Sequence, residues 1–306
     1  MWPTRANRAK QIMALLELFS RETKSLPGVA KPEACEALAW QVVASLRRMD
    51  YTQLLRQRAI SHRRTDPGDE MFDPEMAAIV WASDGNLDEA FWLLFLATHF
   101  GKHGKTGWLR LRQIYSGLGK SSWTWARTSS DPKAFEAWLA KNYSQIEGGF
   151  GNHRKYETIK PIPNKGTGAI VASYIAWVGP SRSHADLVSR LVREAGNDPH
   201  SIFDRFYKSM TVARFGRLAR FDFLALVGRL HLAPIEPGSA YLTESTGPRR
   251  GARLLFLGHT EDKSSDKSLD RWLVELDQKL GVGMQVLEDS LCNWQKSPDL
   301  FVHFTG

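Results

Sequence analysis

The chain has 306 residues, with 41 lysines and arginines against 33 aspartates and glutamates, which gives a net charge of +8. Hydrophobic residues make up 42% and charged residues 24%, a globular composition that excludes wholesale disorder, collagen-like structure and a small disulfide scaffold. Two cysteines, Cys35 and Cys292, are too few for a disulfide framework or a four-cysteine zinc site, which is typical of a reducing compartment.

Neither secretion nor membrane insertion is expected. The basic N-terminus, Met1 to Lys10, leads into an amphipathic stretch and not into the apolar core of a signal peptide. The longest strongly apolar run, Ala90 to Ala97, is far shorter than the roughly 20 residues that span a bilayer. We therefore expect a cytoplasmic protein, and we expect it to be monomeric.

Apolar residues recur at helical spacing through most of the chain, which predicts a mostly α fold. Between Leu38 and Met49 they lie four, four and three residues apart, behind Pro32, a residue suited to the first turn of a helix. Asn86 and Glu89 have the spacing of a capping box and predict a helix start there. Further helices are predicted over residues 131–139, 183–195, 269–280 and 284–298.

Strand-like alternation is weak and occurs around residues 241–243 and 302–304. Two segments, 63–70 and 260–267, are polar and rich in turn residues. We expect the second of them to be a surface loop. We expect the first to separate an N-terminal helical region, residues 1–85, from a main domain, residues 86–306.

Two patterns suggest ligand sites but fail on spacing. Ser116 to Ser122 (SGLGKSS) contains Gly-Lys-Ser, yet Ile114 stands where a phosphate loop needs a glycine. His99 and His103 lie four residues apart, as on one face of a helix, but no glutamate follows the first histidine and no third ligand is evident. We therefore expect neither a nucleotide-binding loop nor a metal, and no cofactor.

Positive charge is concentrated between Arg205 and Leu257, where nine basic residues stand against three acidic ones. This density is typical of a phosphate-binding surface, or of an ordinary solvated basic face. Within it, Arg214, Arg217 and Arg220 lie three residues apart, which predicts a narrow cationic stripe on a helix. Asp222 follows among aromatic residues, either as an ion-pair partner of these arginines or as a buried acid with a raised pKa.

The octet FGNHRKYE, residues 150–157, holds too many polar side chains to be core material. In a loop, Asn152 or His153 could contact a base edge, Arg154 or Lys155 a phosphate, and Tyr156 could stack on a base. An exposed polar turn is the alternative on composition alone.

Residues 242–257 (LTESTGPRRGARLLFL) resemble a helix-hairpin-helix element, with a glycine turn at Gly247 followed by a helix. The free N–H groups at such a helix start can hold a DNA phosphate, and Arg249, Arg250 and Arg253 add positive charge.

Residues 284–298 (MQVLEDSLCNWQKSP) form an amphipathic pattern. Its apolar side consists of Met284, Leu287, Leu291 and Trp294. Its polar side consists of Gln285, Glu288, Asp289, Cys292, Asn293 and Lys296. These polar side chains either line a pocket or form an ordinary solvated helix face.

Five blocks in this order, FGNHRKYE, RFGRLARFD, IEPGSAYL, TGPRRGARLLF and VLEDSLCNWQKSP, resemble the alpha-glutamyl/putrescinyl thymine pyrophosphorylase family. The resemblance covers roughly Phe91 to Gly306. It implies a fold similar to that of helix-hairpin-helix DNA glycosylases, and an association with the hypermodified bases of bacteriophage DNA. The implied protein binds double-stranded DNA and turns a modified pyrimidine out of the base stack.

Two chemistries are compatible with this resemblance. In the first, a carboxylate stabilises the cationic state that forms as water hydrolyses the N-glycosidic bond, which leaves an abasic site. In the second, an amine displaces pyrophosphate from a hydroxymethyl pyrimidine, which would favour a dense anion cradle or a metal site. Because the chain has no phosphate loop and no carboxylate cluster at metal spacing, we favour a DNA glycosylase active in anti-phage defence. The transferase comes second, and a non-catalytic reader of modified DNA is a third hypothesis.

For the catalytic aspartate we favour Asp289, with Asp222 second. Helix-hairpin-helix glycosylases carry an aspartate some twenty residues beyond the hairpin glycine, which keeps Asp266 and Asp270 as alternatives. The predicted substrate-binding residues are Asn152, His153, Tyr156, Glu157, Gln285, Glu288 and Asn293. The predicted DNA-binding residues are Arg154, Lys155, Arg214, Arg217, Arg220, Gly247, Arg249, Arg250, Arg253 and Lys296.

Overall fold

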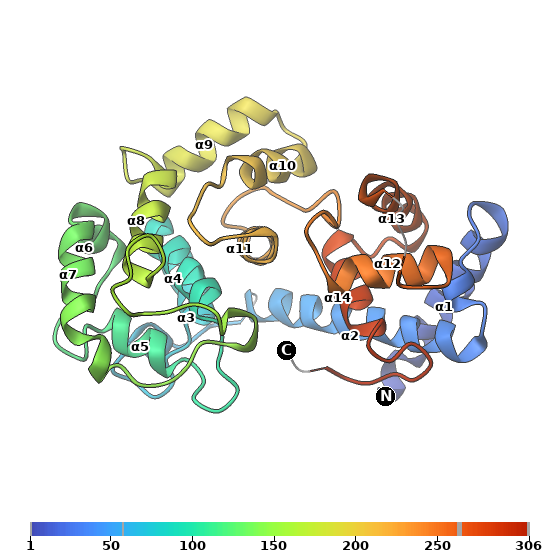
Figure 1. Ribbon diagram of the computed structural model, residues 1–306, viewed down its shortest axis with the longest axis horizontal. Helices are drawn as coiled ribbons and strands as arrows, with labels where there is room; N and C mark the ends of the chain where they lie inside the picture. The colour runs from blue at the N-terminus through green and yellow to red at the C-terminus, as the bar shows by residue number, and fades with distance from the viewer. Residues whose placement is uncertain (1, 57, 262–264, 305–306) are drawn as a thin grey trace. The chain divides into compact units, whose positions relative to one another are not determined.

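The computed structural model describes residues 2–56, 58–261 and 265–304, and the chain divides into two compact units (Figure 1). The first unit comprises Met1–Gln53 and Pro237–Gly306, and the second comprises Leu54–Glu236. Throughout the described ranges the regular elements are helices, so the predicted mostly α fold is confirmed. The strand signals at 241–243 and 302–304 are wrong, because the chain is irregular there.

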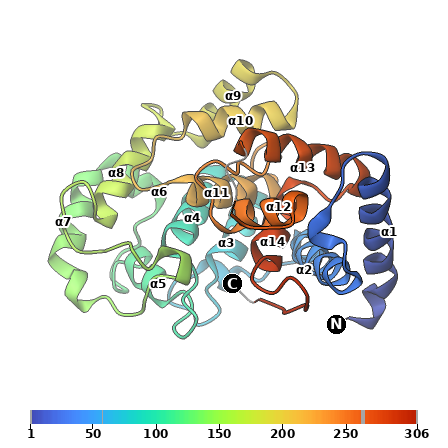
Figure 2. The same cartoon turned by 45° about the vertical axis from the view of Figure 1, so that its right-hand side comes forward.

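The first unit joins the two ends of the chain in one hydrophobic core. Leu269, Leu273, Leu276 and Leu280 are all buried in it, which confirms the predicted apolar stripe. In Figures 1 and 2 the blue N-terminal helices lie beside the orange and red C-terminal ones. Its elements are η1 (Pro3–Arg5), α1 (Ala6–Glu22), η2 (Pro27–Val29), α2 (Pro32–Arg56, as far as Gln53), α12 (Gly247–Leu257), α13 (Asp266–Leu280) and α14 (Met284–Trp294).

Helices α12 and α14 pack closely because α12 presents two glycines to α14. A Cβ atom on Gly247 would stand 2.6 Å from the Sγ atom of Cys292, and one on Gly251 would overlap the carbonyl oxygen of Leu291. Residues four apart lie on one face of a helix, so the two glycines form a continuous contact surface. The start of α12 is therefore held against the polar side of α14.

The second unit is arranged around α4, which is buried on all sides from Glu89 to Phe100. A helix that is apolar all round belongs in the centre of a core. The elements of this unit are η3 (His62–Thr65), α3 (Pro74–Ser83), α4 (Leu87–Phe100), α5 (Leu109–Tyr115), α6 (Trp125–Ser130), α7 (Pro132–Asn142), η4 (Tyr143–Gln145), η5 (Asn152–Arg154), α8 (Thr167–Val178), α9 (His184–Ala195), α10 (Pro199–Ser209) and α11 (Arg217–Arg229).

The start of α4 confirms half of the predicted capping box. The side chain of Asn86 accepts a hydrogen bond from the backbone N–H of Glu89 at 3.1 Å. The Glu89 carboxylate instead accepts from the Tyr115 hydroxyl at 2.6 Å and from the backbone N–H of Trp125 at 2.8 Å. The Glu89 side chain, which the capping-box spacing assigns to the start of α4, thus connects α4 to α5 and α6.

The predicted division after residue 85 separates α3 from α4, two helices that pack against each other in the second unit, and it stays a prediction. The loop predicted over 260–267 falls partly outside the described residues, and α13 already begins at Asp266. Within the ranges that the structure describes, no helix has both the length and the apolar composition of a membrane span.

Replacement of Gly251 tests the close approach of α12 to α14. Gly251→Ala should lower the free energy of unfolding by about 1–3 kcal/mol, because the added methyl group overlaps backbone that cannot move aside freely. Gly104→Ala is the matched control, since a Cβ there meets nothing within 4 Å, and it should change stability by less than about 0.5 kcal/mol. Equal urea midpoints for the two variants would contradict the packing argument.

His99, at the end of α4, should make stability depend on pH. The ring is 1% exposed, its Nε2 lies 2.9 Å from the hydroxyl of Thr167, and burial lowers its pKa to about 3, with Arg154 and Arg214 acting in the same direction. Because histidine in the unfolded chain takes up this proton at its ordinary pKa of 6.5, the stabilisation is complete above about pH 6.5 and is lost as the pH falls towards 3.

His99→Gln should therefore flatten the acid limb of the stability curve by about 1.4 kcal/mol per pH unit, the value of one proton. The measurement is urea denaturation between pH 7 and pH 4. His259→Gln, which removes an exposed histidine, should leave the limb as it is. A wild-type slope in His99→Gln would contradict the assignment.

Candidate functional site

The predicted site residues form two groups, one in each unit. In the first unit, α14 buries Met284, Leu287, Leu291 and Trp294, which confirms the predicted apolar side. The helix ends at Trp294, earlier than predicted, and the indole N–H of Trp294 donates to the carbonyl of Pro298 at 3.0 Å. The polar residues therefore lie on a helix that is firmly anchored.

Asp289 lies in a polar network on this helix. Its carboxylate forms an ion pair with the guanidinium of Arg48 on α2 and accepts from the Nδ2 atom of Asn293 at 3.2 Å. Lys296 donates in turn to the Oδ1 atom of Asn293 at 2.9 Å. The Asp289 side chain is 33% exposed, so this network holds a carboxylate that solvent or a ligand can still reach. The sequence prediction missed Arg48, which lies outside the resembling blocks.

The remaining polar residues of α14 do not form one solvated face. Glu288 is 8% exposed and belongs to the interior of the unit, whereas Gln285 is partly exposed. Cys292 lies against Gly247 at the start of α12, three residues along α14 from Asp289. The N-terminus of α12 and the Asp289 carboxylate thus belong to the same side of the first unit.

The helix predicted after Gly247 is present as α12, with Thr246 as its N-cap residue and Pro248 in its first turn. The complete helix-hairpin-helix element predicted over 242–257 is absent, because residues 230–246 before α12 are irregular chain. Pro234 and Pro237 explain this, since proline lacks an N–H and disfavours helical conformation in the preceding residue.

The three arginines of α12 differ in their surroundings. Arg249 and Arg253 lie four residues apart and pair with the carboxylate of Asp266 on α13, at 3.4 and 3.6 Å. Arg250 is exposed. Asp270 accepts from the Ser239 hydroxyl at 2.8 Å and from the Leu242 N–H at 3.1 Å, so its carboxylate fastens the loop before α12.

In the second unit, one ion pair joins the octet to α11 and a second joins it to the segment just before α11. Arg154 pairs with Asp222 at 3.1 Å and donates to the carbonyl of Thr98 at 2.8 Å. Arg214 pairs with Glu157 at 2.8 Å. One of the two predictions for Asp222 was an ion-pair partner, and the structure shows it paired with Arg154. Its side chain is 42% exposed.

The predicted stripe of Arg214, Arg217 and Arg220 is wrong. Helix α11 begins only at Arg217, and Arg214 precedes it with a left-handed φ of 60°. Arg217 is 4% exposed, with its guanidinium 4.7 Å from the ring centroid of Phe221. Arg220 donates to the carbonyl of Phe215 at 3.1 Å. The three arginines therefore do not present one stripe of charge on a helix.

The tip of the octet is exposed. Asn152, His153 and Lys155 lie at the surface, and Tyr156 is 77% exposed. The Lys155 ammonium lies 5.3 Å from the ring centroid of Tyr156. Arg154 within this tip and Glu157 directly after it are held by ion pairs, so the exposed side chains stand on a braced loop.

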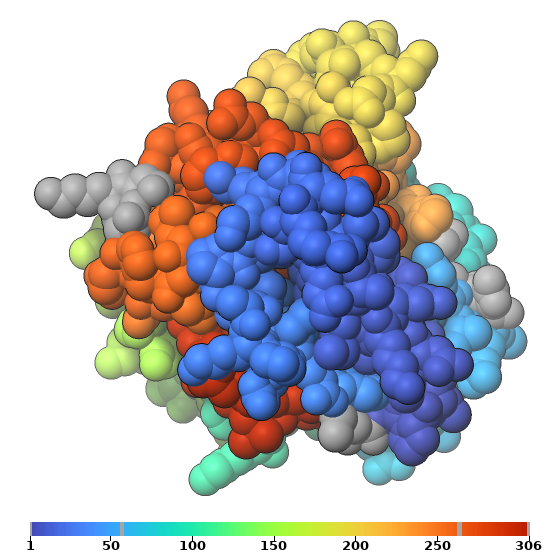
Figure 3. Space-filling view, turned by 90° about the vertical axis from the view of Figure 1, so that its right-hand side faces the viewer, coloured from blue at the N-terminus to red at the C-terminus, as the bar shows by residue number. Residues whose placement is uncertain are grey.

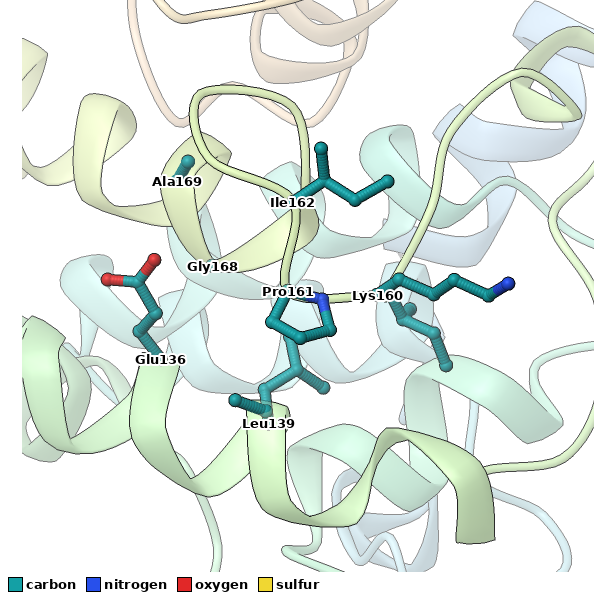
Figure 4. Close-up of a pocket in the computed structure, with 10 residues that line it drawn as sticks. Glu136, Leu139, Lys160, Pro161, Ile162, Gly168 and Ala169 are labelled. Carbon is teal, nitrogen blue, oxygen red and sulfur yellow. The ribbon is translucent and has the colours of Figure 1, made fainter.

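Figure 4 shows a small pocket of the second unit, between α7, α8 and the loop at Lys160 to Ile162. Glu136 and Leu139 face it from α7, and Gly168 and Ala169 from α8. Its volume is about 10 Å³, roughly that of one water molecule. A nucleobase therefore does not fit in it.

The two rejected motifs have structural roles. In SGLGKSS, the N–H groups of Leu118 and Gly119 donate to the carbonyls of Gln113 and Ser116, at 2.8 and 3.1 Å, so they are used within the protein. His103 lies in a turn beyond the end of α4 at Phe100 and not on the same helical face as His99.

One family model matches the chain over residues 33–306: alpha-glutamyl/putrescinyl thymine pyrophosphorylase clade 3. Curated proteins and solved structures give no match. The matched range includes α2 with Arg48 as well as every segment of the predicted site. The family is named for an enzyme that acts on a modified thymine. The chain belongs to the alpha-glutamyl/putrescinyl thymine pyrophosphorylase family, clade 3.

Proposed function

We propose that the chain is a DNA glycosylase that turns a hypermodified pyrimidine out of duplex DNA and hydrolyses its N-glycosidic bond. The observation that carries this proposal is the reachable carboxylate of Asp289, held by Arg48 and Asn293 on the same side of the first unit as the start of α12. This hydrolysis requires at least a carboxylate and a water molecule at the sugar–base bond.

In the proposed reaction, the bond between the sugar C1′ atom and the base nitrogen breaks as a water oxygen bonds to C1′. The base leaves with the electron pair of the broken bond, and Asp289 accepts the proton that the water loses. An ionised carboxylate also stabilises the positive charge that develops on the sugar. Arg48 and Asn293 fix the orientation of the Asp289 carboxylate.

The start of α12 is the proposed contact to the DNA backbone. Its N-terminal N–H groups and the helix dipole favour an anion, and Arg250 and Lys296 are exposed nearby in the same unit. Arg249 and Arg253 contribute less net charge, because Asp266 pairs with both of them. Gln285 and Asn293 remain the proposed contacts to the extruded base, whereas Glu288, which is 8% exposed, lies in the interior and is not one of them.

The octet of the second unit is a second proposed DNA contact. Tyr156 offers an exposed ring for stacking, Asn152 and His153 offer hydrogen-bonding groups, and Lys155 offers a charge for phosphate. Arg154, Glu157, Arg214, Arg217 and Arg220 act here through the packing that braces this loop and α11. Asp222, which pairs with Arg154, is the second candidate for the catalytic carboxylate.

A transferase is the second candidate function, because the family description names a pyrophosphorylase. Displacement of pyrophosphate needs several cations around the leaving group. Arg249 and Arg253 are the natural choice, but their pairing with Asp266 already neutralises part of their charge. We therefore place the glycosylase first. The proposed setting is the cytoplasm, where a monomer would act on phage DNA that carries such bases.

Incubation with hypermodified and ordinary phage DNA tests the reaction. The wild-type protein should release free modified base and leave abasic sites only in the hypermodified DNA, both measured by mass spectrometry. Asp289→Asn should reduce the rate by about 10²–10⁴-fold, the range for loss of a general acid or base. Asp299→Asn, which changes an exposed carboxylate of the same terminal segment, is the control and should keep full activity.

Other outcomes separate the alternatives. A modified base that stays in the DNA and carries a new amine would assign the transferase. Loss of activity in Asp222→Asn, with full activity in Asp289→Asn, would move the catalytic site to the second unit. Binding without any reaction, unaffected by either substitution, would assign a reader.

Arg250 tests the proposed backbone contact. Arg250→Ala should weaken binding to all DNA sequences and reduce the slope of log K against log salt concentration by about one, since one phosphate contact is lost. Arg249→Ala should have a smaller effect, because Asp266 already pairs with that arginine. Fluorescence anisotropy over a range of NaCl concentrations measures both slopes, and an unchanged slope in Arg250→Ala would remove α12 from the interface.

A further inference from the structure

A second feature of the first unit is a cavity between α1 and α2 that no residue of the Asp289 network lines. Its volume is about 430 Å³, within the range of small-molecule sites. Figure 3 faces the side of the molecule on which α1 and α2 lie next to each other. The residues that matter here are Trp2, Ala6, Lys10, Met13, Glu36 and Trp40.

The walls of this cavity are aromatic and held in place. The Trp2 and Trp40 ring centroids lie 6.3 Å apart at an interplanar angle of 51°. Trp2 is held by Phe301 and His303, whose rings meet it edge-on, and by the guanidinium of Arg47, 3.9 Å from the Trp2 ring centroid. None of these three residues lines the cavity, so they support Trp2 from outside it.

The cavity also carries one charge of each sign. The carboxylate of Glu36 is fixed by the indole N–H of Trp40, which donates to its Oε1 atom at 3.3 Å. Lys10 supplies an ammonium group from α1. Among the ion pairs of the described residues, neither Lys10 nor Glu36 takes part in one. Neither charge is thus neutralised by an ion pair of the described residues, and both can pair with a ligand.

We propose that this cavity binds a free amino acid with an aromatic side chain. The ligand ammonium pairs with Glu36, the ligand carboxylate pairs with Lys10, and the ring packs against the indoles of Trp2 and Trp40. The apolar walls of the cavity suit the aromatic ring of such a ligand, and Glu36 and Lys10 suit its ammonium and carboxylate groups. The site is independent of the proposed DNA chemistry, because it shares no residue with it.

Isothermal titration of the full chain with three related probes tests this proposal. L-phenylalanine has both charges, phenethylamine lacks the carboxylate, and 3-phenylpropionate lacks the ammonium group. L-phenylalanine should bind about tenfold more tightly than either analogue, since each lost ion pair removes a charge-assisted hydrogen bond. Equal affinity for all three probes, or no binding of L-phenylalanine, would overturn the proposal.

Two variants assign the charges. Lys10→Met should abolish the advantage of L-phenylalanine over phenethylamine, and Glu36→Gln should abolish its advantage over 3-phenylpropionate. Lys31→Met and Glu33→Gln remove exposed charges that do not line the cavity and should leave all affinities unchanged. The positions of all four substitutions are exposed, so each variant should fold, which circular dichroism checks. If Lys10→Met and Glu36→Gln keep the wild-type preferences, the proposed orientation is wrong.

Discussion

The close contact of α12 with α14 is the constraint on which the proposed site depends. Gly247 and Gly251 bring the two helix backbones together, so that the start of α12 lies against Cys292, near Asp289. A larger residue in place of Gly247 or Gly251 would push the start of α12 away from α14 and from the Asp289 carboxylate. The same contact therefore serves the stability of the first unit and the geometry proposed for its chemistry.

Ion pairs in the fold reduce the positive charge that the sequence alone suggests for one part of this protein. Along the chain, residues 205–257 are strongly basic. In the fold, several of these charges are paired with acids from other segments: Arg214 with Glu157, Arg205 with Glu194, and Arg249 with Asp266. Partly buried pairs of this kind fix the conformation of loops and helix ends. What remains for a polyanionic partner is a smaller set, to which exposed Arg250 belongs.

Local sequence patterns predicted several of the helices, because helix periodicity and caps act within a few residues. The apolar stripe of α13 and the Asn86 cap are examples. Long-range contacts leave no such pattern. Arg48 and Asp289 are 241 residues apart in the chain, so their ion pair could not be read from either segment. The arginine stripe was predicted from residue spacing alone, which assumes a continuous helix. The left-handed backbone conformation of Arg214 is not helical, so Arg214 does not share a helical face with Arg217 and Arg220.

The central claim is that the sugar–base bond is hydrolysed. The most direct measurement is the mass of an intact duplex strand that contains one hypermodified pyrimidine, before and after a single turnover. Our account predicts a strand lighter by the base and heavier by one water oxygen and hydrogen, together with the free base in solution. A strand that keeps its base, loses the mass of pyrophosphate and gains that of an amine would contradict it.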